Sequence, residues 1–429
     1  MKKTYIIVVV LLLVSSFLFA GDKKISMSGR VLMEMVKENN TSDFTAYDEE
    51  NPSGTNDSQL YGDGRVDLKF KATINKIVTA YVSTRFEGKG SGDKWMNFGS
   101  DESGEGDQLK DAWPALQEAY VNIDNLFNSP LNMKMGRQGI GYGAGNIIDD
   151  KFDGLTLNLD MEKFYANLHF LIIDAYGNFE TAEGDHNLTA LSLNGGMNGV
   201  ADMMDINAYF WRTAETVLDN EDSSETVTNA VNVIGARAEA GLMDGLLSPY
   251  FEFAIQSGGN GQGEEISYSG MLLDIGTDLE KDLGSMTIDA MFEFFMASGD
   301  DMETNDEYEH FGLIDLSGRE EGWFDQEVAL EGNQMIKFGL GMTPASLEAF
   351  HAGLTFWMFN DNSSNYENEA GEEISGENMY NELGIDASYK ITKKTKLYGG
   401  LSYIMPNEDY PGYGEDAGTA MYFGTQVKW

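Results

Sequence analysis

The sequence predicts an all-β protein: a closed, antiparallel transmembrane β-barrel of about eighteen strands. Three observations lead to this prediction. Apolar and polar residues alternate along most of the chain, the links between alternating segments are short and long in turn, and the one long apolar run lies at the N-terminus. Alternation with period two is typical of a strand with one apolar and one polar face. A chain that crosses lipid without an apolar helix must close its strands into a barrel.

The N-terminal segment has the pattern of a signal peptide. Met1-Lys2-Lys3 is positively charged, Ile6 to Val14 is wholly apolar, and Ala20-Gly21 offers a cleavage site. The apolar run is shorter than the roughly 20 residues of a spanning helix. We therefore expect a signal peptide over residues 1–20 and a single barrel domain over 21–429, in the outer membrane of a Gram-negative-type (diderm) bacterium.

Eighteen segments show the alternation after residue 20. In segment 65–74, for example, Val66, Leu68 and Phe70 alternate with Arg65, Asp67 and Lys69, and the rest follow the same rule with varying clarity. The predicted strands are 25–36, 65–74, 78–87, 115–124, 131–138, 153–160, 163–173, 188–194, 202–212, 230–240, 248–257, 265–277, 285–297, 334–342, 347–358, 380–391, 395–405 and 418–429.

The links between these segments alternate in length. Those after even-numbered strands are short, such as 75–77 and 392–394, and those after odd-numbered strands are long, except 258–264. Short turns at one end and long loops at the other are typical of outer-membrane barrels. The pattern predicts periplasmic turns and termini with extracellular loops. A soluble sandwich would need several domains and a linker, and a solenoid would need a fixed repeat; neither is visible.

The composition narrows the function. The formal net charge of −43, from 71 acids and 28 bases, argues against a nucleic-acid partner. The acids concentrate in segments 43–57, 101–111 and 300–331, which suit either a solvated rim or a mouth that collects calcium or other cations. With no cysteine, four scattered histidines and no G-x-S-x-G elbow, we expect neither an enzyme nor a bound cofactor.

Inward-facing charges are the candidate functional residues. In a barrel the alternate polar residues line the lumen, so the early strands would form a basic wall and later strands an acidic one. Such a transverse field orients solutes, although pairing between neighbouring strands, as of Arg65 and Asp67 with Arg85 and Glu87, would only stabilise the lumen. The predicted pore-lining residues are Arg30, Arg65, Lys69, Arg85, Asp289, Glu293, Glu382 and Asp386.

Inward aromatic residues allow two interpretations. Aromatic faces stack on sugar rings, which would suit an oligosaccharide path, but aromatic residues also form the girdle at a membrane boundary. The second interpretation is favoured for Tyr209 and Trp211, which lie near a strand end. The residues concerned are Tyr81, Tyr120, Tyr165, Tyr209 and Trp211.

An ordered set of motifs lies within residues 116–160. Leu116 to Val121 reads LQEAYV, Met133 to Gln138 reads MKMGRQ, and Tyr142-Gly143 and Phe152 to Leu155 (FDGL) follow. This set resembles the alginate-export family of outer-membrane porins. The resemblance implies an eighteen-stranded barrel that passes an anionic polysaccharide through an arginine-rich constriction. It also implies a pore or strand-end role for Arg137.

The sequence therefore predicts an outer-membrane porin for passive diffusion of small hydrophilic or charged solutes. Inward charges and an infolded loop such as 298–333 would narrow its lumen. A dedicated alginate-like exporter and a surface adhesin or receptor anchored by the barrel are the alternatives. The expected partners are outer-membrane lipids, small solutes or oligosaccharides and, because the chain ends on the amphipathic strand closed by Trp429, the barrel-assembly machinery.

Overall fold

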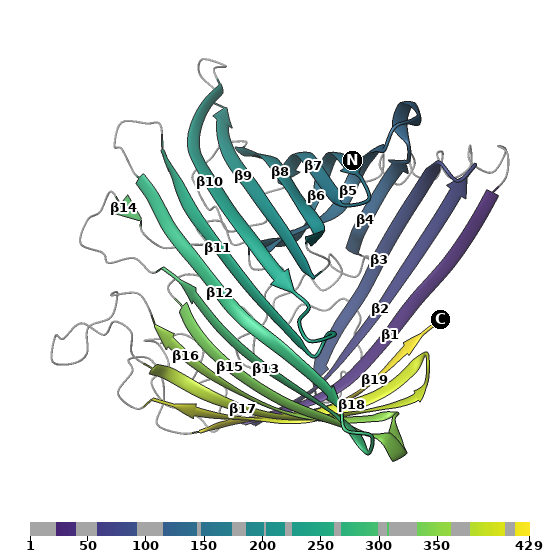
Figure 1. Cartoon of the computed structure of the whole chain (residues 1–429), viewed down its shortest axis with the longest axis vertical. Coiled ribbons are helices and arrows are strands. Elements are labelled where there is room, and N and C mark those ends of the chain that lie inside the picture. Colours follow the sequence, from purple (N-terminus) through teal and green to yellow (C-terminus); the bar gives the residue numbers. More distant parts are fainter. Residues whose placement is uncertain are drawn as a thin grey trace.

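A closed ring of antiparallel strands forms the molecule (Figure 1). The computed structural model describes residues 23–39, 58–91, 115–143, 147–173, 186–200, 203–218, 225–260, 267–298, 307–308, 333–361, 378–407 and 417–429. Each strand pairs with the next along the chain, and the last pairs with the first. The ring strands are β1 (Lys23–Asn39), β2 (Ser58–Ile74), β3 (Val78–Ser91), β4 (Ala115–Ile123), β5 (Leu131–Tyr142), β6 (Ile148–Asp160), β7 (Phe164–Ile173), β8 (His186–Val200), β9 (Met204–Leu218), β10 (Glu225–Ala240), β11 (Leu247–Asn260), β12 (Ser267–Asp282), β13 (Met286–Ala297), β15 (Asn333–Pro344), β16 (Phe350–Asp361), β17 (Asn378–Thr392), β18 (Thr395–Pro406) and β19 (Gly418–Lys428).

The eighteen predicted strands correspond one to one with these ring strands, so the predicted fold is confirmed. The two-residue β14 (Glu307–Tyr308) is an addition that pairs in parallel with β12. The structure corrects the boundaries: β2 begins at Ser58 rather than 65, and β12 runs on to Asp282, through a predicted turn. Backbone hydrogen bonds extend a ladder where the side-chain alternation has already stopped.

Several predictions concern segments outside the described residues. These are the signal peptide at 1–20, the acidic segments 43–57 and 101–111, and loop 298–333 apart from Ser298, Glu307, Tyr308 and Asn333. We call the barrel end with the short connections the turn end and the opposite end the loop end. Two of the turns contain a single 3-10 turn, η2 (Leu126–Asn128) and η4 (Ala345–Leu347).

The β2–β3 turn shows how sequence sets a hairpin. Asn75 and Lys76 both have positive φ, 48° and 59°, and the Ile77 amide donates a hydrogen bond of 3.0 Å to the Ile74 carbonyl. Positive φ at both central residues defines a type I′ turn, whose twist matches that of paired strands. Asparagine tolerates this conformation well, so Asn75 favours the tight connection.

The two faces of the ring differ in chemistry. Large apolar side chains such as Met27, Phe70 and Leu340 are exposed on the outer face, whereas the inner face buries polar residues such as Asp67 and Glu252. This arrangement is the reverse of a soluble protein and is what a lipid-embedded barrel requires. In the part of the chain that the structure describes, no helix combines the length and apolar character that a membrane crossing needs.

The β1–β19 seam closes the ring, and in Figure 1 the yellow β19 lies beside the purple β1. The Trp429 amide donates a hydrogen bond of 3.1 Å to the Gly29 carbonyl, and the Trp429 indole lies directly over Gly29. A Cβ atom at Gly29 would clash with that indole. The glycine therefore forms a notch that receives the last side chain of the barrel.

We predict that Gly29→Ala destabilises the folded barrel by about 1–3 kcal/mol, the usual cost of inserting a methyl group where no space exists. Urea unfolding followed by circular dichroism measures this change. Gly241→Ala is the matched control, because a Cβ atom there meets no atom within 4 Å. Equal unfolding midpoints for the two variants would contradict the role of the notch.

Candidate functional site

Strand alternation assigns eight of the nine predicted pore-lining residues to the inner face. Arg137 is the exception: it shares its face of β5 with the exposed Met135, whereas the neighbouring Gln138 is buried inside. Arg137 Nη1 lies 3.7 Å from Asp153 Oδ2, its cross-strand partner on β6. The motif resemblance predicted a pore role for Arg137, but its position in the strand places it on the outer wall.

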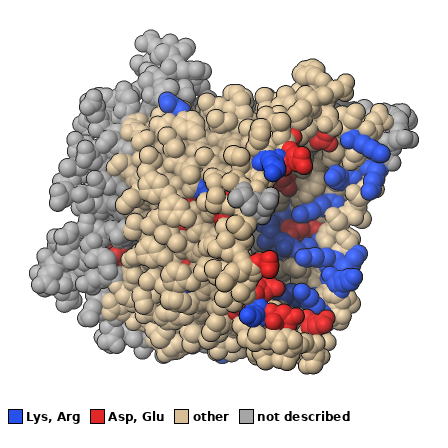
Figure 2. Space-filling model, viewed as in Figure 1, with Lys and Arg blue, Asp and Glu red and all other residues tan. Residues whose placement is uncertain are grey.

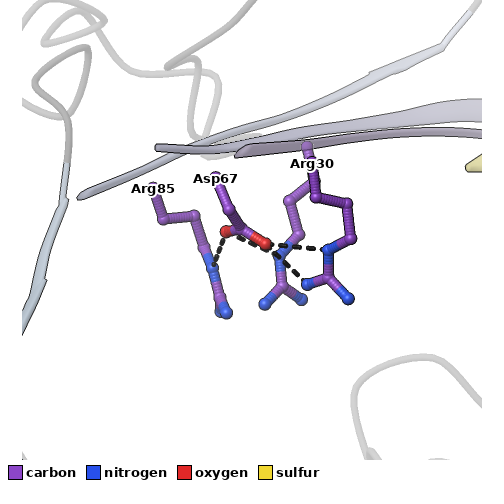
Figure 3. A network of polar contacts seen from close by, with 4 residues as sticks. Arg30, Asp67 and Arg85 are labelled. Carbon is purple, nitrogen blue, oxygen red and sulfur yellow. Dashed lines mark hydrogen bonds and ion pairs between the residues drawn. The ribbon is translucent and has the colours of Figure 1, made fainter. Parts of the chain in front are cut away.

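Three arginines surround one aspartate on β1–β3 (Figure 3). Arg30 donates to Asp67 Oδ2 at 2.6 and 3.0 Å, while the Nε atoms of Arg85 and Arg65 lie 3.0 and 3.3 Å from Oδ1. Strand register produces this group, since Arg30 and Arg85 are the direct cross-strand partners of Asp67. We call these four residues the Asp67 cluster.

The predicted alternative of cross-strand pairing is therefore realised, but unevenly. Arg85 on β3 pairs with Asp67 on β2 as expected, yet Arg30 on β1 and Arg65 on β2 itself share the same carboxylate. One negative charge leaves two of the three positive charges uncompensated within the cluster. Lys69 and Lys71 follow on β2 toward the turn end, on the same inner face and exposed. This wall thus presents positive charge to the lumen.

The opposite wall holds the inverse arrangement around Arg237 on β10. Its Nη1 lies 3.2 Å from Glu252 Oε2 and 3.9 Å from Asp274 Oδ2, and its Nε lies 3.9 Å from Glu239 Oε2. The Arg237 guanidinium also lies 4.3 Å from the centre of the Tyr250 ring, a cation–π contact. We call Arg237 with its three acids the Arg237 cluster. Strands β2 and β11 are half the ring apart, so the two clusters lie on opposite walls.

Two of the four residues of the predicted acidic wall are removed from solvent. Glu293 and Glu382 are 5% and 1% exposed; Lys337 Nζ lies 3.9 Å from Glu293 Oε2, and Ser402 donates a hydrogen bond to Glu382. Asp289 and Asp386 retain more exposure, and Asp289 Oδ1 lies 3.9 Å from His351 Nδ1. A buried, paired carboxylate acts on a passing solute less than an exposed one does.

The end of β5 turns into the lumen and fills the β8–β11 side. The Tyr142 ring stacks on Tyr209 at 5.8 Å between ring centres, and its hydroxyl hydrogen-bonds Ser192. Gly143 follows with a φ of 62° and lies so close to the Glu252 carboxylate that no side chain would fit. Only glycine takes this conformation and this approach at low cost. The β5–β6 connection is thus the infolded element within the described residues.

The predicted aromatic residues have different positions. Tyr209 and Trp211 are buried on the inner face, so the girdle interpretation was wrong for these two. Tyr209 donates a hydrogen bond of 2.6 Å to Glu252. Tyr81 and Tyr120 stack on each other at 5.0 Å, with the Lys134 ammonium 4.7 Å from the Tyr120 ring centre.

An asymmetric lumen follows from these contacts. The infolded residues lie against the strands of the Arg237 cluster, while β1–β3 keep exposed basic side chains. Figure 2 shows Lys and Arg gathered at the right of the view, over the region of β1–β3, with some Asp and Glu among them, beside a hollow in the surface. Among the described residues, the side of the lumen that the infolded segment leaves uncovered is therefore the basic side.

Sequence reasoning missed three parts of this site. Asp67 was weighed only in a pairing between two adjacent strands, and Arg237 was not singled out although it shares an inner face with Val231 and Val233. Tyr142 was assigned to a long loop over 139–152. The alternate glycines at 139, 141, 143 and 145 are the signal that could have revealed a tight, close-packed connection there.

Comparison with known proteins gives a fold and no family. No protein-family model matches the chain, and no curated protein matches it. Solved structures do match it. The chain is 13% identical to Acinetobacter baumannii OccAB2 (TM-score 0.55, covering 94% of this chain and 98% of that one). It is 10% identical to Pseudomonas aeruginosa OccK3 (OpdO), with a TM-score of 0.56 and coverage of 94% and 96%. It is 8% identical to P. aeruginosa OpdK solved with vanillate, with a TM-score of 0.54 and coverage of 94% and 99%. At such identities the likeness shows a shared outer-membrane barrel fold; these structures are not alginate exporters by name.

Proposed function

We propose that this chain is a channel in the outer membrane of a diderm bacterium, through which small anionic solutes diffuse passively along the β1–β3 wall. The observation that carries the proposal is the Asp67 cluster, where three guanidinium groups share one carboxylate on the side of the lumen that the described infolded residues leave uncovered. Guanidinium groups bind carboxylate and phosphate oxygens through a planar fork of donors. The likeness to porin structures supports the channel, and the vanillate bound to OpdK is a small carboxylate.

The balance of the two walls supports anions over cations. Two of the three acids of the Arg237 cluster, Glu252 and Asp274, are buried, whereas Glu239 is exposed. Glu252 is held by Arg237 and Tyr209, and Gly143 of the infolded segment lies against it. The arginines of the Asp67 cluster are a quarter to a third exposed. Because screening weakens a charge beyond about 10 Å at 0.1 M salt, the nearest exposed charges dominate the field in a narrow lumen.

The mechanism is diffusion with orientation, and no bond is made or broken. A solute carboxylate would exchange water for the guanidinium groups and pass along β2 toward Lys69 and Lys71. Export of an anionic polysaccharide, as in the alginate-export family, is the second candidate, favoured by the same basic wall. We further infer cleavage of residues 1–20 during export and insertion by the barrel-assembly machinery, for which Trp429 would be the terminal signal.

Substitutions in the Asp67 cluster should move ion selectivity in opposite directions. Arg30→Gln, Arg65→Gln and Arg85→Gln should each lower the anion-to-cation permeability ratio, and Asp67→Asn should raise it. Two charges about 4 Å apart interact by about 1 kcal/mol in water, which corresponds to roughly a fivefold change in the ratio. The reversal potential of the purified protein in a planar bilayer across a salt gradient measures it.

Glu382→Gln is the matched control for these variants, because Glu382 is buried against Ser402 and should change the reversal potential little. The proposal that anions pass along the β1–β3 wall would be contradicted by a parent channel that selects cations. Equal shifts of the reversal potential in all five variants would contradict it as well. A folded barrel without conductance would leave the anchor for surface loops as the remaining function.

Tyr142→Ala should increase single-channel conductance. The substitution removes the ring stack with Tyr209 and the hydrogen bond to Ser192, and so frees the infolded residues from the β8–β9 wall. Tyr142→Phe is the matched control: it keeps the ring and should stay near the parent value. An unchanged conductance of Tyr142→Ala would show that this segment does not limit the open cross-section.

A further inference from the structure

Every hairpin turn at the turn end carries a large, exposed apolar side chain at or beside its tip. A soluble turn is normally built from glycine, asparagine, aspartate, serine or proline. Several of the eight turns contain such residues, for example Asn75 and Gly284, but among the described residues each turn also exposes one large apolar side chain. The eight apolar residues are Ile77, Phe127, Met161, Met203, Met243, Leu283, Leu347 and Ile391.

The backbone makes two of these residues harder to explain as ordinary turn residues. Phe127 and Met243 both have a φ of 56°, in the left-handed region that bulky side chains rarely adopt. They are also the most exposed of the eight, at 89% and 73%. Neither the conformation nor internal packing favours phenylalanine or methionine at these positions, so the reason must lie outside the barrel.

The outer face of β5 and β6 lacks part of the apolar band that contacts lipid. From the turn end, Leu131, Met133 and Met135 are apolar, but Arg137, Gly139 and Gly141 follow. On β6 the cross-strand partners Leu159, Leu157 and Leu155 give way to Asp153, Lys151 and Asp149. At about 3.4 Å per residue and a tilt of about 40°, three outward residues cover only about 10 Å of a membrane band that is about 25 Å tall.

The turns next to β5 and β6 lie at the turn end of this short apolar band, where further apolar side chains lengthen it. Phe127 belongs to the turn that leads into β5, and Met161 to the turn that leaves β6. Met161 also continues the outward alternation of Leu155, Leu157 and Leu159. Ile391 likewise continues the outward series of Ile385 and Tyr389 on β17. These tips are therefore continuous with the lipid-facing band.

We propose that the turn tips are embedded in the periplasmic leaflet of the outer membrane, and that on the β5–β6 sector Phe127 and Met161 replace the apolar wall lost above Met135. Lipid is the occupant that the arrangement favours. The tips are spread around the whole ring, and a leaflet surrounds a barrel on every side. A docked protein would instead need one contiguous patch.

The proposal assumes insertion in a bilayer but not conduction, so its test is independent of the channel measurements. The chain contains no cysteine, which makes single-cysteine labelling clean. Phe127→Cys and Met161→Cys would carry an environment-sensitive fluorophore in phosphatidylcholine vesicles. Bromine atoms near the top of the acyl chains then quench a fluorophore that lies at that depth.

Two outer-face positions provide the matched controls. Leu340→Cys lies in the apolar band, and Asp149→Cys lies at the loop end of β6. We expect the brominated vesicles to quench positions 127 and 161 about as strongly as position 340, and at least twofold more than position 149. Quenching at 127 and 161 no greater than at 149 would overturn the proposal and leave the tips as a surface for a periplasmic protein.

A second measurement needs no label. Phe127→Ser should lower the urea midpoint of unfolding in vesicles but not in detergent micelles, which adapt their thickness to the barrel. Asn128→Ser is the control, because Asn128 is also exposed and has nearly the same φ, 58°. Since Phe127 makes few contacts within the protein, a loss confined to vesicles reports the lipid. An equal midpoint for parent and variant in vesicles would contradict the embedding.

Discussion

Closure of the ring between β1 and β19 is the constraint on which the rest of this structure depends. Only a closed ring gives each strand two unlike faces without leaving an unpaired edge, and lipid tolerates no such edge. Gly29 and Trp429 hold the seam by a fit of shape, and the backbone ladder runs from Arg30 to Asn39 beside it. With the ring closed, every second residue of each strand is committed to the lumen and the others to lipid.

The lumen uses the same residue types in two opposite proportions. Around Asp67 three arginines share one carboxylate, and around Arg237 three carboxylates share one arginine. Each cluster is held together by its minority charge and carries the sign of its majority. The two differ in solvent access, because Gly143 at the end of β5 lies against the buried Glu252 of the Arg237 cluster, while among the described residues nothing comparable lies against the arginines of the Asp67 cluster. Burial, more than the count of charges, gives the lumen its polarity.

The outer face also combines charged residues with an apolar surface. Lipid demands a continuous apolar band, yet Arg137 and Asp153 interrupt it on β5 and β6 and meet each other across the strands. An ion pair on that face is tolerable where water or headgroups can reach it, which places Arg137 and Asp153 near the extracellular headgroups and the turn end of this sector within the bilayer. The apolar turn tips then have a physical reason. Both the strands and the turns therefore contribute apolar surface to the contact between the barrel and the membrane.

The sequence by itself determined the eighteen strands, their order and which residues share a face, because period-two alternation is a local property of each strand. It also determined that Arg30, Arg65 and Arg85 face inward with Asp67 among them. Only the tertiary structure decided which inward charges are buried, as Glu293 and Glu382 are. It also decided that Tyr142 and Gly143 contact residues of β9 and β11. These outcomes depend on strand register and on contacts between strands far apart in the ring, which no local pattern encodes. For Arg137, the alternation of side chains within β5 places the residue on the outer wall, whereas the resemblance to the alginate-export family had suggested a position in the pore.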